Sequence, residues 1–180
     1  MREIRTIMVI GAGSTGCNIA YAAALGGFRT ILEDILPASL RRAESEIQNT
    51  LRSAMTEGRF SREAAEAALA KIEFASTVEQ AAREADLAIE CVPDELESKL
   101  EIFTLLDRVC RPGTILASTS SSLTISEISS ITFRAQLCVG LRINEAQMKL
   151  VCGTETDEET QLACMAVGQK MGREVSVVRE

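Results

Sequence analysis

The feature that most constrains the fold is a glycine-rich stretch, GAGSTG, at residues 11–16. It follows an apolar run, Thr6–Ile10, which predicts a short buried strand. The alanine-rich segment after it has apolar residues at helical spacing, which predicts a helix over Ser14–Leu25. A second strand is predicted over Arg29–Glu33. Strand, tight turn, helix and strand together predict a βαβ unit with parallel strands.

The rest of the chain continues the alternation of strands and helices. A long polar helix over residues 38–55 and a second helix capped by Ser61 predict a helical hairpin that projects from the sheet. Capping boxes are predicted where Thr77, Thr124 and Thr156 each precede Gln or Glu by three residues. Further strands are predicted at residues 72–74, 87–92, 114–118, 136–141, 148–152 and 174–178. The pattern favours one α/β domain over residues 1–180, with a doubly wound, largely parallel, Rossmann-type sheet.

Composition excludes several classes of function. The net charge of −7 gives no basic footprint for nucleic acid or for an anionic membrane surface. No apolar run approaches the ~18 residues of a membrane span, and no secretory leader is recognisable, so we expect a cytoplasmic protein. The chain has six cysteines without a CxxC pair and no histidine, so we expect reduced thiols and no metal site.

The glycines at positions 11, 13 and 16 fit the G-x-G-x-x-G pattern of dinucleotide-binding turns. In that pattern Gly11 permits the tight turn, Gly13 leaves room for a pyrophosphate, and Gly16 lets the helix approach the sheet. The first amides of the helix, at Ser14 and Thr15, then favour the phosphate charge. We therefore predict a binding site for a nicotinamide dinucleotide at this turn.

Asp34 lies 18 residues after Gly16, at the end of the second predicted strand. A carboxylate in this place accepts hydrogen bonds from the adenine-ribose hydroxyls, and Glu33 beside it disfavours a 2′-phosphate. Arg41 and Arg42 lie further along the chain, so NAD is predicted rather than NADP. The structural alternative is a glycine turn followed by an unrelated carboxylate at a strand end.

Two later segments resemble a known family. IECVPDELESKLEIF at Ile89–Phe103 and ILASTSSSLTI at Ile115–Ile125 are similar to the NAD-binding domain of the 3-hydroxyacyl-CoA dehydrogenases, oxidoreductases of fatty acid metabolism. The resemblance implies that Asp94 and Lys99 face the nicotinamide half of the cofactor, with Lys99 available to a phosphate or substrate group. It also implies that Ser121 reaches the substrate's hydroxyl or carbonyl. Alternatively, Asp94 begins a helix, Lys99 is solvated and Ser121 completes a turn.

The chain departs from this family where the family carries its catalytic dyad. Family members usually have a segment like GMHFFNP before MKLVE, in which the histidine accepts the substrate's proton and the glutamate orients the histidine. Here VGLRINEAQMKLVCG puts Arg142 and Cys152 at those two positions, with a turn two residues shorter. Arginine stays protonated and cannot act as the base, although it can bind an anion. Glu145 is either a substitute base or an exposed loop charge.

The resemblance also implies a helical domain after the last strand, which closes over the cofactor and often forms the dimer, and these 180 residues do not contain it. We therefore expect a helical partner domain or a homodimer, and a small-molecule substrate or anionic ligand. One hypothesis is an NAD(H)-binding module that is weak or inactive alone. The alternative is an active oxidoreductase on a 3-hydroxyacyl-CoA or related hydroxy acid, with water or Glu145 as the base.

Overall fold

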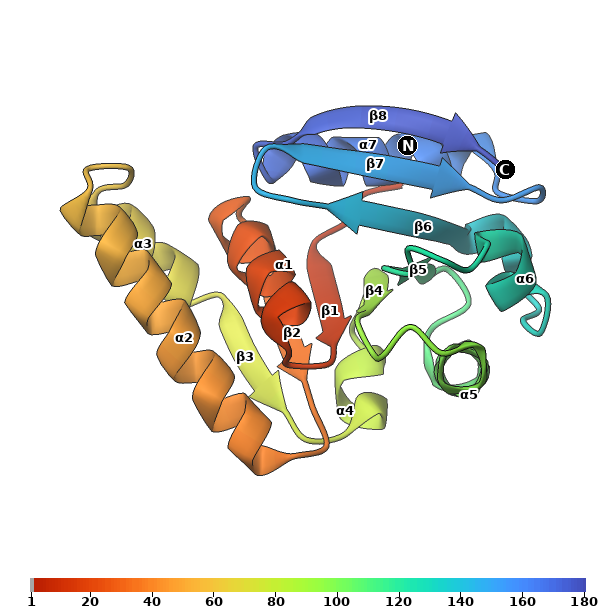
Figure 1. The fold of residues 1–180 in the computed structure, drawn as a ribbon, viewed down its shortest axis with the longest axis horizontal. Coiled ribbons are helices and arrows are strands. Elements are labelled where there is room, and N and C mark those ends of the chain that lie inside the picture. The colour runs from red at the N-terminus through yellow and green to blue at the C-terminus, as the bar shows by residue number, and fades with distance from the viewer. Residues whose placement is uncertain (1) are drawn as a thin grey trace.

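The computed structural model describes residues 2–180 and contains one eight-stranded sheet in the order β3-β2-β1-β4-β5-β6-β7-β8. All neighbouring strands are parallel except β6 and β7 (Figure 1). The strands are β1 (Thr6–Ile10), β2 (Arg29–Glu33), β3 (Ile72–Ala75), β4 (Leu87–Glu90), β5 (Ile115–Ser118), β6 (Cys138–Ile143), β7 (Gln147–Cys152) and β8 (Glu174–Arg179). The predicted doubly wound, largely parallel sheet is confirmed.

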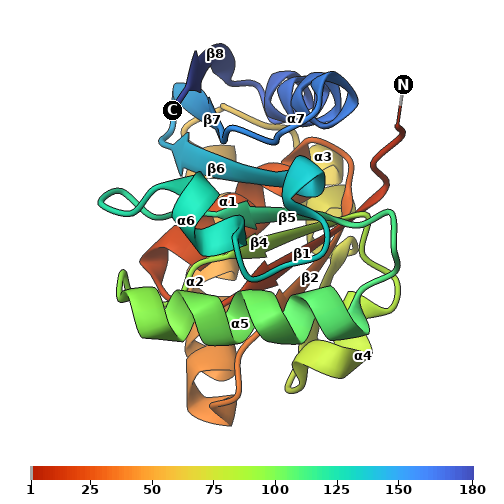
Figure 2. The same ribbon diagram turned by 90° about the vertical axis from the view of Figure 1, so that its right-hand side faces the viewer.

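Helices cover both faces of the sheet because its central strands are apolar on both sides. One face packs against α1 (Ser14–Leu25), α2 (Pro37–Thr56), α3 (Arg62–Leu69) and α7 (Glu158–Lys170). The other face packs against α4 (Val78–Ala82), α5 (Leu96–Val109) and α6 (Ile125–Ser129), and a short 3-10 turn (Ala135–Leu137) precedes β6. Figure 2 shows α5 lying across this second face. The predicted hairpin is α2 with α3, which packs against α1 at the left of Figure 1.

The hairpin between β6 and β7 sets the geometry of the last part of the sheet. Asn144 Oδ1 accepts hydrogen bonds from the amides of Ala146 (2.9 Å) and Gln147 (2.8 Å), and the Asn144 amide donates to the Gln147 carbonyl (2.9 Å). An asparagine that binds the backbone two residues on is a typical turn device. The resulting tight turn fixes which residues of β6 and β7 lie opposite one another.

Two of the three predicted capping boxes were wrong. The hydroxyl of Thr77 makes no capping bond. Asp157, rather than Thr156, caps α7 through the amide of Thr160 (2.6 Å). Thr156 is buried and donates to the carbonyl of Cys138 (2.7 Å), so its hydroxyl ties β6 to the segment before α7. A buried hydroxyl needs a hydrogen-bond partner. For Thr156 this partner is a backbone carbonyl 18 residues away in the sequence, which local sequence patterns do not reveal.

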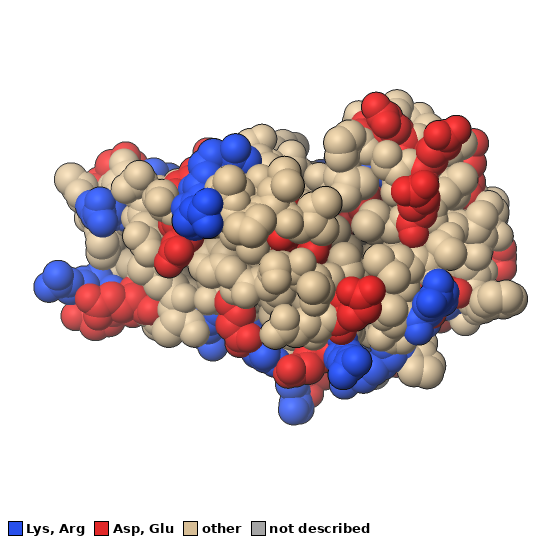
Figure 3. All heavy atoms as spheres, turned by 90° about the horizontal axis from the view of Figure 1, so that it is seen from below, with Lys and Arg blue, Asp and Glu red and all other residues tan. Residues whose placement is uncertain are grey.

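The surface carries charged side chains of both signs. Acidic and basic side chains are interspersed over the face seen from below in Figure 3. Within residues 2–180, no helix is long and apolar enough to cross a membrane, and no His, Cys, Asp or Glu side chains cluster as metal ligands. All six cysteines are free thiols.

Candidate cofactor and substrate site

The glycine-rich turn has the shape that a dinucleotide needs. Gly11 has a φ of +99°, and a Cβ there would lie 3.0 Å from the carbonyl oxygen of Cys91. A Cβ on Gly16 would lie 1.9 Å from the carbonyl oxygen of Gly11, so α1 approaches the turn closely because it lacks a side chain there. A Cβ on Gly13 would meet nothing within 4 Å. The space over Gly13 therefore remains open to a ligand.

The N-terminus of α1 faces this space. No side chain caps the helix, and its first backbone bond runs from the amide of Cys17 to the carbonyl of Gly13 (2.9 Å). The amides of Ser14, Thr15 and Gly16 precede that bond and point out of the helix end. Uncapped amides at a helix N-terminus bind a phosphate through hydrogen bonds and the helix dipole. The turn thus fits the pyrophosphate of NAD.

Asp34 is held beside the turn. Its Oδ2 accepts from the amide of Ala12 (2.9 Å), and its Oδ1 accepts from the amide of Leu36 (2.9 Å). Each carboxylate oxygen has a further lone pair, which is available to a ribose hydroxyl. Neighbouring Glu33 is 1% exposed, and its Oε1 lacks a hydrogen-bond partner among the described residues. Burial, with added repulsion from Asp34 and Glu79, raises the pKa of Glu33 to about 7.

A buried polar cluster lies under the site at the ends of β4 and β5. Lys99 Nζ donates to Glu90 Oε1 (2.8 Å), Glu90 Oε2 (3.0 Å) and the carbonyl of Val92 (3.3 Å). Ser118 Oγ donates to Glu90 Oε2 (2.7 Å). Lys99 is 1% exposed and all three of its N–H donors are used. This geometry argues against the expectation that Lys99 is available to a phosphate or substrate group, and also against a solvated lysine.

Asp94 shapes the serine-rich segment after β5. It accepts from the hydroxyls of Ser120 (2.5 Å), Ser121 (3.2 Å) and Ser122 (2.9 Å), and from the amide of Ser121 (3.2 Å). Partial burial acts to raise the pKa of Asp94, but these hydrogen bonds together hold it well below its usual range. Ser121 is exposed, at the ligand edge of the parallel strands. The cluster thus connects the buried Lys99 to Ser121 through Asp94, whose Oδ1 lies 3.7 Å from Lys99 Nζ.

Arg142 and Cys152 do not face each other. Arg142 lies opposite Lys149 in the β6–β7 register, whereas Cys152 lies opposite Val139. Because Val139 and Arg142 are an odd number of residues apart on one strand, their side chains point to opposite faces of the sheet. Cys152 is buried on the α7 face, and burial raises the pKa of its thiol. Arg142 is exposed on the other face, where its Nη2 donates to the carbonyl of Ser121 (3.1 Å).

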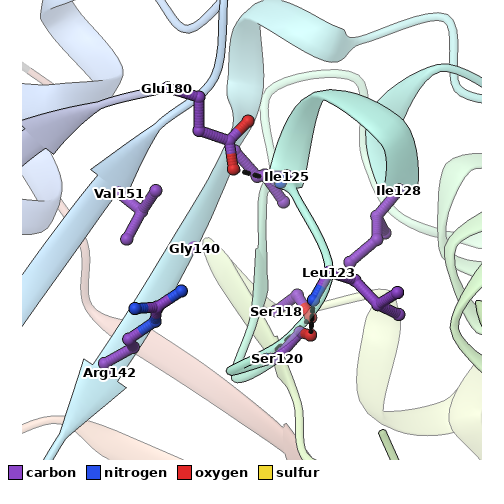
Figure 4. A pocket seen from close by; sticks show the side chains of 9 residues that line it. All are labelled: Ser118, Ser120, Leu123, Ile125, Ile128, Gly140, Arg142, Val151 and Glu180. Carbon is purple, nitrogen blue, oxygen red and sulfur yellow. Dashed lines mark hydrogen bonds between the residues drawn. The ribbon is translucent and has the colours of Figure 1, made fainter. Parts of the chain in front are cut away.

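A shallow pocket lies between Arg142 and α6. Figure 4 shows Arg142 and Glu180 at opposite ends of this pocket, with Gly140 and Val151 between them. Glu180 accepts hydrogen bonds from the amides of Ile125 (2.6 Å) and Ser126 (3.0 Å). Glu145 lies exposed in the hairpin turn beyond Arg142.

Sequence reasoning had not singled out three residues of the site. Glu90 and Ser118 each end a buried apolar strand, and a polar residue in that place is a signal that could have been used. Lys149 gives no such signal, because its place opposite Arg142 follows from the hairpin register.

Comparison with known proteins agrees with this geometry. Residues 6–180 match the family described as 3-hydroxyacyl-CoA dehydrogenase, NAD binding domain. A protein named probable 3-hydroxybutyryl-CoA dehydrogenase, from Bacillus subtilis, is 37% identical over 176 residues, which cover 95% of this chain and 61% of that protein. The chain thus spans about three fifths of this curated relative.

Solved structures show the same likeness. The 3-hydroxybutyryl-CoA dehydrogenase of Escherichia coli superimposes with a TM-score of 0.94 at 29% identity, over 99% of this chain and 39% of that one. A diketoreductase, described as acting on dicarbonyl compounds, superimposes with a TM-score of 0.93 at 27% identity, over 100% of this chain and 66% of that one.

Proposed function

The chain belongs to the 3-hydroxyacyl-CoA dehydrogenase family as its NAD-binding domain, and we propose that by itself it binds NAD(H) but is a weak or inactive dehydrogenase. The NAD assignment agrees with the open space over Gly13, the uncapped start of α1 and the orientation of Asp34. When bound, NAD supplies a hydride acceptor. The residues of this chain must then orient the substrate and remove its proton.

The observation that carries the proposal is the placement of Arg142. It stands beside Ser121, where the family places its histidine, and a guanidinium cannot accept a proton at any working pH. Cys152 cannot compensate, because it is a buried neutral thiol on the opposite face of the sheet. A positioned base typically contributes ~10²–10⁴-fold to such a reaction. Loss of the dyad therefore removes most of the acid–base contribution.

The alternative is an active oxidoreductase that acts on a 3-hydroxyacyl-CoA or a related hydroxy acid. It is favoured by Asp94 and Ser121, whose hydrogen bonds preserve the segment that would meet a substrate hydroxyl. In this alternative, water or Glu145 is the base. A helical partner domain or a second copy of the chain closes the cleft and excludes water.

One pair of measurements separates the two. Calorimetric titration with NAD tests cofactor binding, and a steady-state assay with 3-hydroxybutyryl-CoA and NAD tests turnover. We expect binding with turnover at least ~10²-fold below ordinary dehydrogenase rates. Ordinary rates from the isolated chain would refute the proposal and favour the alternative. Absence of NAD binding would refute both.

A further inference from the structure

Arg142 and Lys149 form a row of cations on the part of the last three strands that α6 leaves uncovered. The register places Arg142 opposite Lys149, and Lys149 opposite Ser176 of β8. Residues directly opposite each other in a sheet project from the same face, so the three side chains are neighbours. All three are exposed, whereas the alternate residues of β7 are buried under α7.

The two cations lie close together without a compensating carboxylate. A backbone hydrogen bond joins Asn144 to Gln147, and the opposed pair of Arg142 and Lys149 lies two residues further along the same two strands. They are therefore a hydrogen-bonded pair, with their Cα atoms about 5.5 Å apart. No ion pair within residues 2–180 includes either side chain. Like charges directly opposite in a sheet are destabilising.

Three carboxylates around the row have other hydrogen-bond partners. Glu180 shares the pocket with Arg142 but accepts two amides of α6 and lies at the far end (Figure 4). Glu174 lies one row beyond Lys149, opposite Gln147, whose side-chain amide donates to it (3.4 Å). Asp94 is surrounded by serine donors. An external anion is therefore the partner that this row lacks.

We infer that Arg142 and Lys149 bind one carboxylate, so that the ligand held beside the bound cofactor is a short hydroxy acid with a free carboxylate. The inference rests on the proposed function, because it takes the space beside Ser121 as the substrate site. A planar guanidinium binds a carboxylate through two parallel hydrogen bonds, and the ammonium adds a point charge. A thioester carbonyl is neutral and cannot compensate two cations.

The position of Ser121 limits the size of this ligand. Arg142 Nη2 lies 3.1 Å from the backbone carbonyl of Ser121, so the guanidinium borders the residue that would meet the hydroxyl. A carboxylate on Arg142 and a hydroxyl at Ser121 thus belong to one small molecule, with few carbons between them. Ser176 is a further donor at the outer end of the row.

The test is calorimetric titration of the chain, saturated with NADH, with 3-hydroxybutyrate and with its methyl ester. The acid should bind and the ester should not. Arg142→Gln should weaken binding of the acid by about 10-fold or more, because a charged hydrogen-bonded pair is lost. Lys149→Gln should weaken it by a smaller factor. Arg179→Gln, an exposed cation on the α7 face of β8, is the matched control and should leave the affinity unchanged.

Four outcomes would overturn the inference: no binding of the acid, equal binding of acid and ester, an unchanged affinity of the Arg142→Gln variant, or tighter binding of inorganic phosphate. The preceding titration with NADH alone tests the proposed function separately. A chain that binds NADH but not the acid refutes the carboxylate site and leaves the cofactor assignment standing. A chain that does not bind NADH refutes the proposed function.

Discussion

Lys99 Nζ lies 2.8 Å from Glu90 Oε1, and both side chains are buried, with exposures of 1% and 0%. A buried ion pair is costly to break, because the remaining charge loses its partner in a medium that solvates it poorly. Here the pair also positions Ser118, whose hydroxyl binds Glu90 and accepts from the amide of Ser120 (3.2 Å). The pair therefore supports the serine segment from below.

Lys99→Met should lower the free energy of unfolding by about 3–5 kcal/mol, because Glu90 would stay buried without a cation. Urea denaturation followed by circular dichroism measures the change. The double variant Lys99→Met with Glu90→Gln should recover much of the loss, since it removes both charges. A loss below about 1 kcal/mol in the single variant would show that the pair is not buried as described.

Glu33 should make the stability depend on pH. Its pKa in the fold is raised to about 7 from an ordinary value of 4.5, so folding favours the neutral carboxyl. Its stability contribution is therefore full below pH 4.5 and is lost as the pH rises through about 7. The free energy of unfolding of Glu33→Gln, relative to that of the parent protein, should therefore rise across this window, by about 3 kcal/mol at most.

Denaturation of both proteins at several pH values between 4 and 8 checks this dependence. Glu44→Gln, which removes an exposed carboxylate from α2, is the control and should show no such gain. If the difference between Glu33→Gln and the parent is the same at every pH, Glu33 does not titrate in this window.

Asp34 should govern the choice between NAD and NADP. Its oxygens are fixed by the amides of Ala12 and Leu36, and its charge repels an added 2′-phosphate. Asp34→Ala should weaken NAD binding by about 10-fold or more and shrink the preference over NADP. Asp34→Asn keeps one acceptor oxygen without the charge and separates the two effects. Equal affinities of the parent for both cofactors would contradict the assignment.

Gly13 and Gly16 should respond differently to an added side chain. Gly13 has φ −79° and ψ −177°, which other residues adopt, and the space around its Cβ position is open. Gly13→Val should therefore keep its melting temperature but lose NAD binding, because the valine occupies the pyrophosphate space. Gly16→Ala should lower the melting temperature, since its Cβ would meet the backbone of Gly11 at 1.9 Å. If Gly13→Val binds NAD with the affinity of the parent protein, the pyrophosphate does not lie over Gly13.

Local patterns were sufficient for the parts of the fold and site that depend on neighbours in sequence. The strand over Thr6–Ile10, the helix over Ser14–Leu25 and the strand over Arg29–Glu33 were predicted with their observed bounds. Burial of Lys99 was not predictable in this way, because its partner Glu90 is reached across a helix-to-strand packing contact. The face occupied by Cys152 was likewise hidden, since one residue of register in a hairpin reverses every side chain of a strand.

This register leads to the last prediction, which concerns restoring a dyad. In the variant Arg142→His with Cys152→Glu, the new carboxylate would lie on the α7 face, opposite Val139, and could not orient an imidazole at position 142. We expect no gain in 3-hydroxybutyryl-CoA oxidation, and a loss of stability from a buried charge. Arg142→His with Lys149→Glu puts both groups on one face, in directly opposite positions. Steady-state rates of the two double variants should thus rank the second above the first, whereas a higher rate for the Cys152→Glu combination would contradict the register on which this prediction rests.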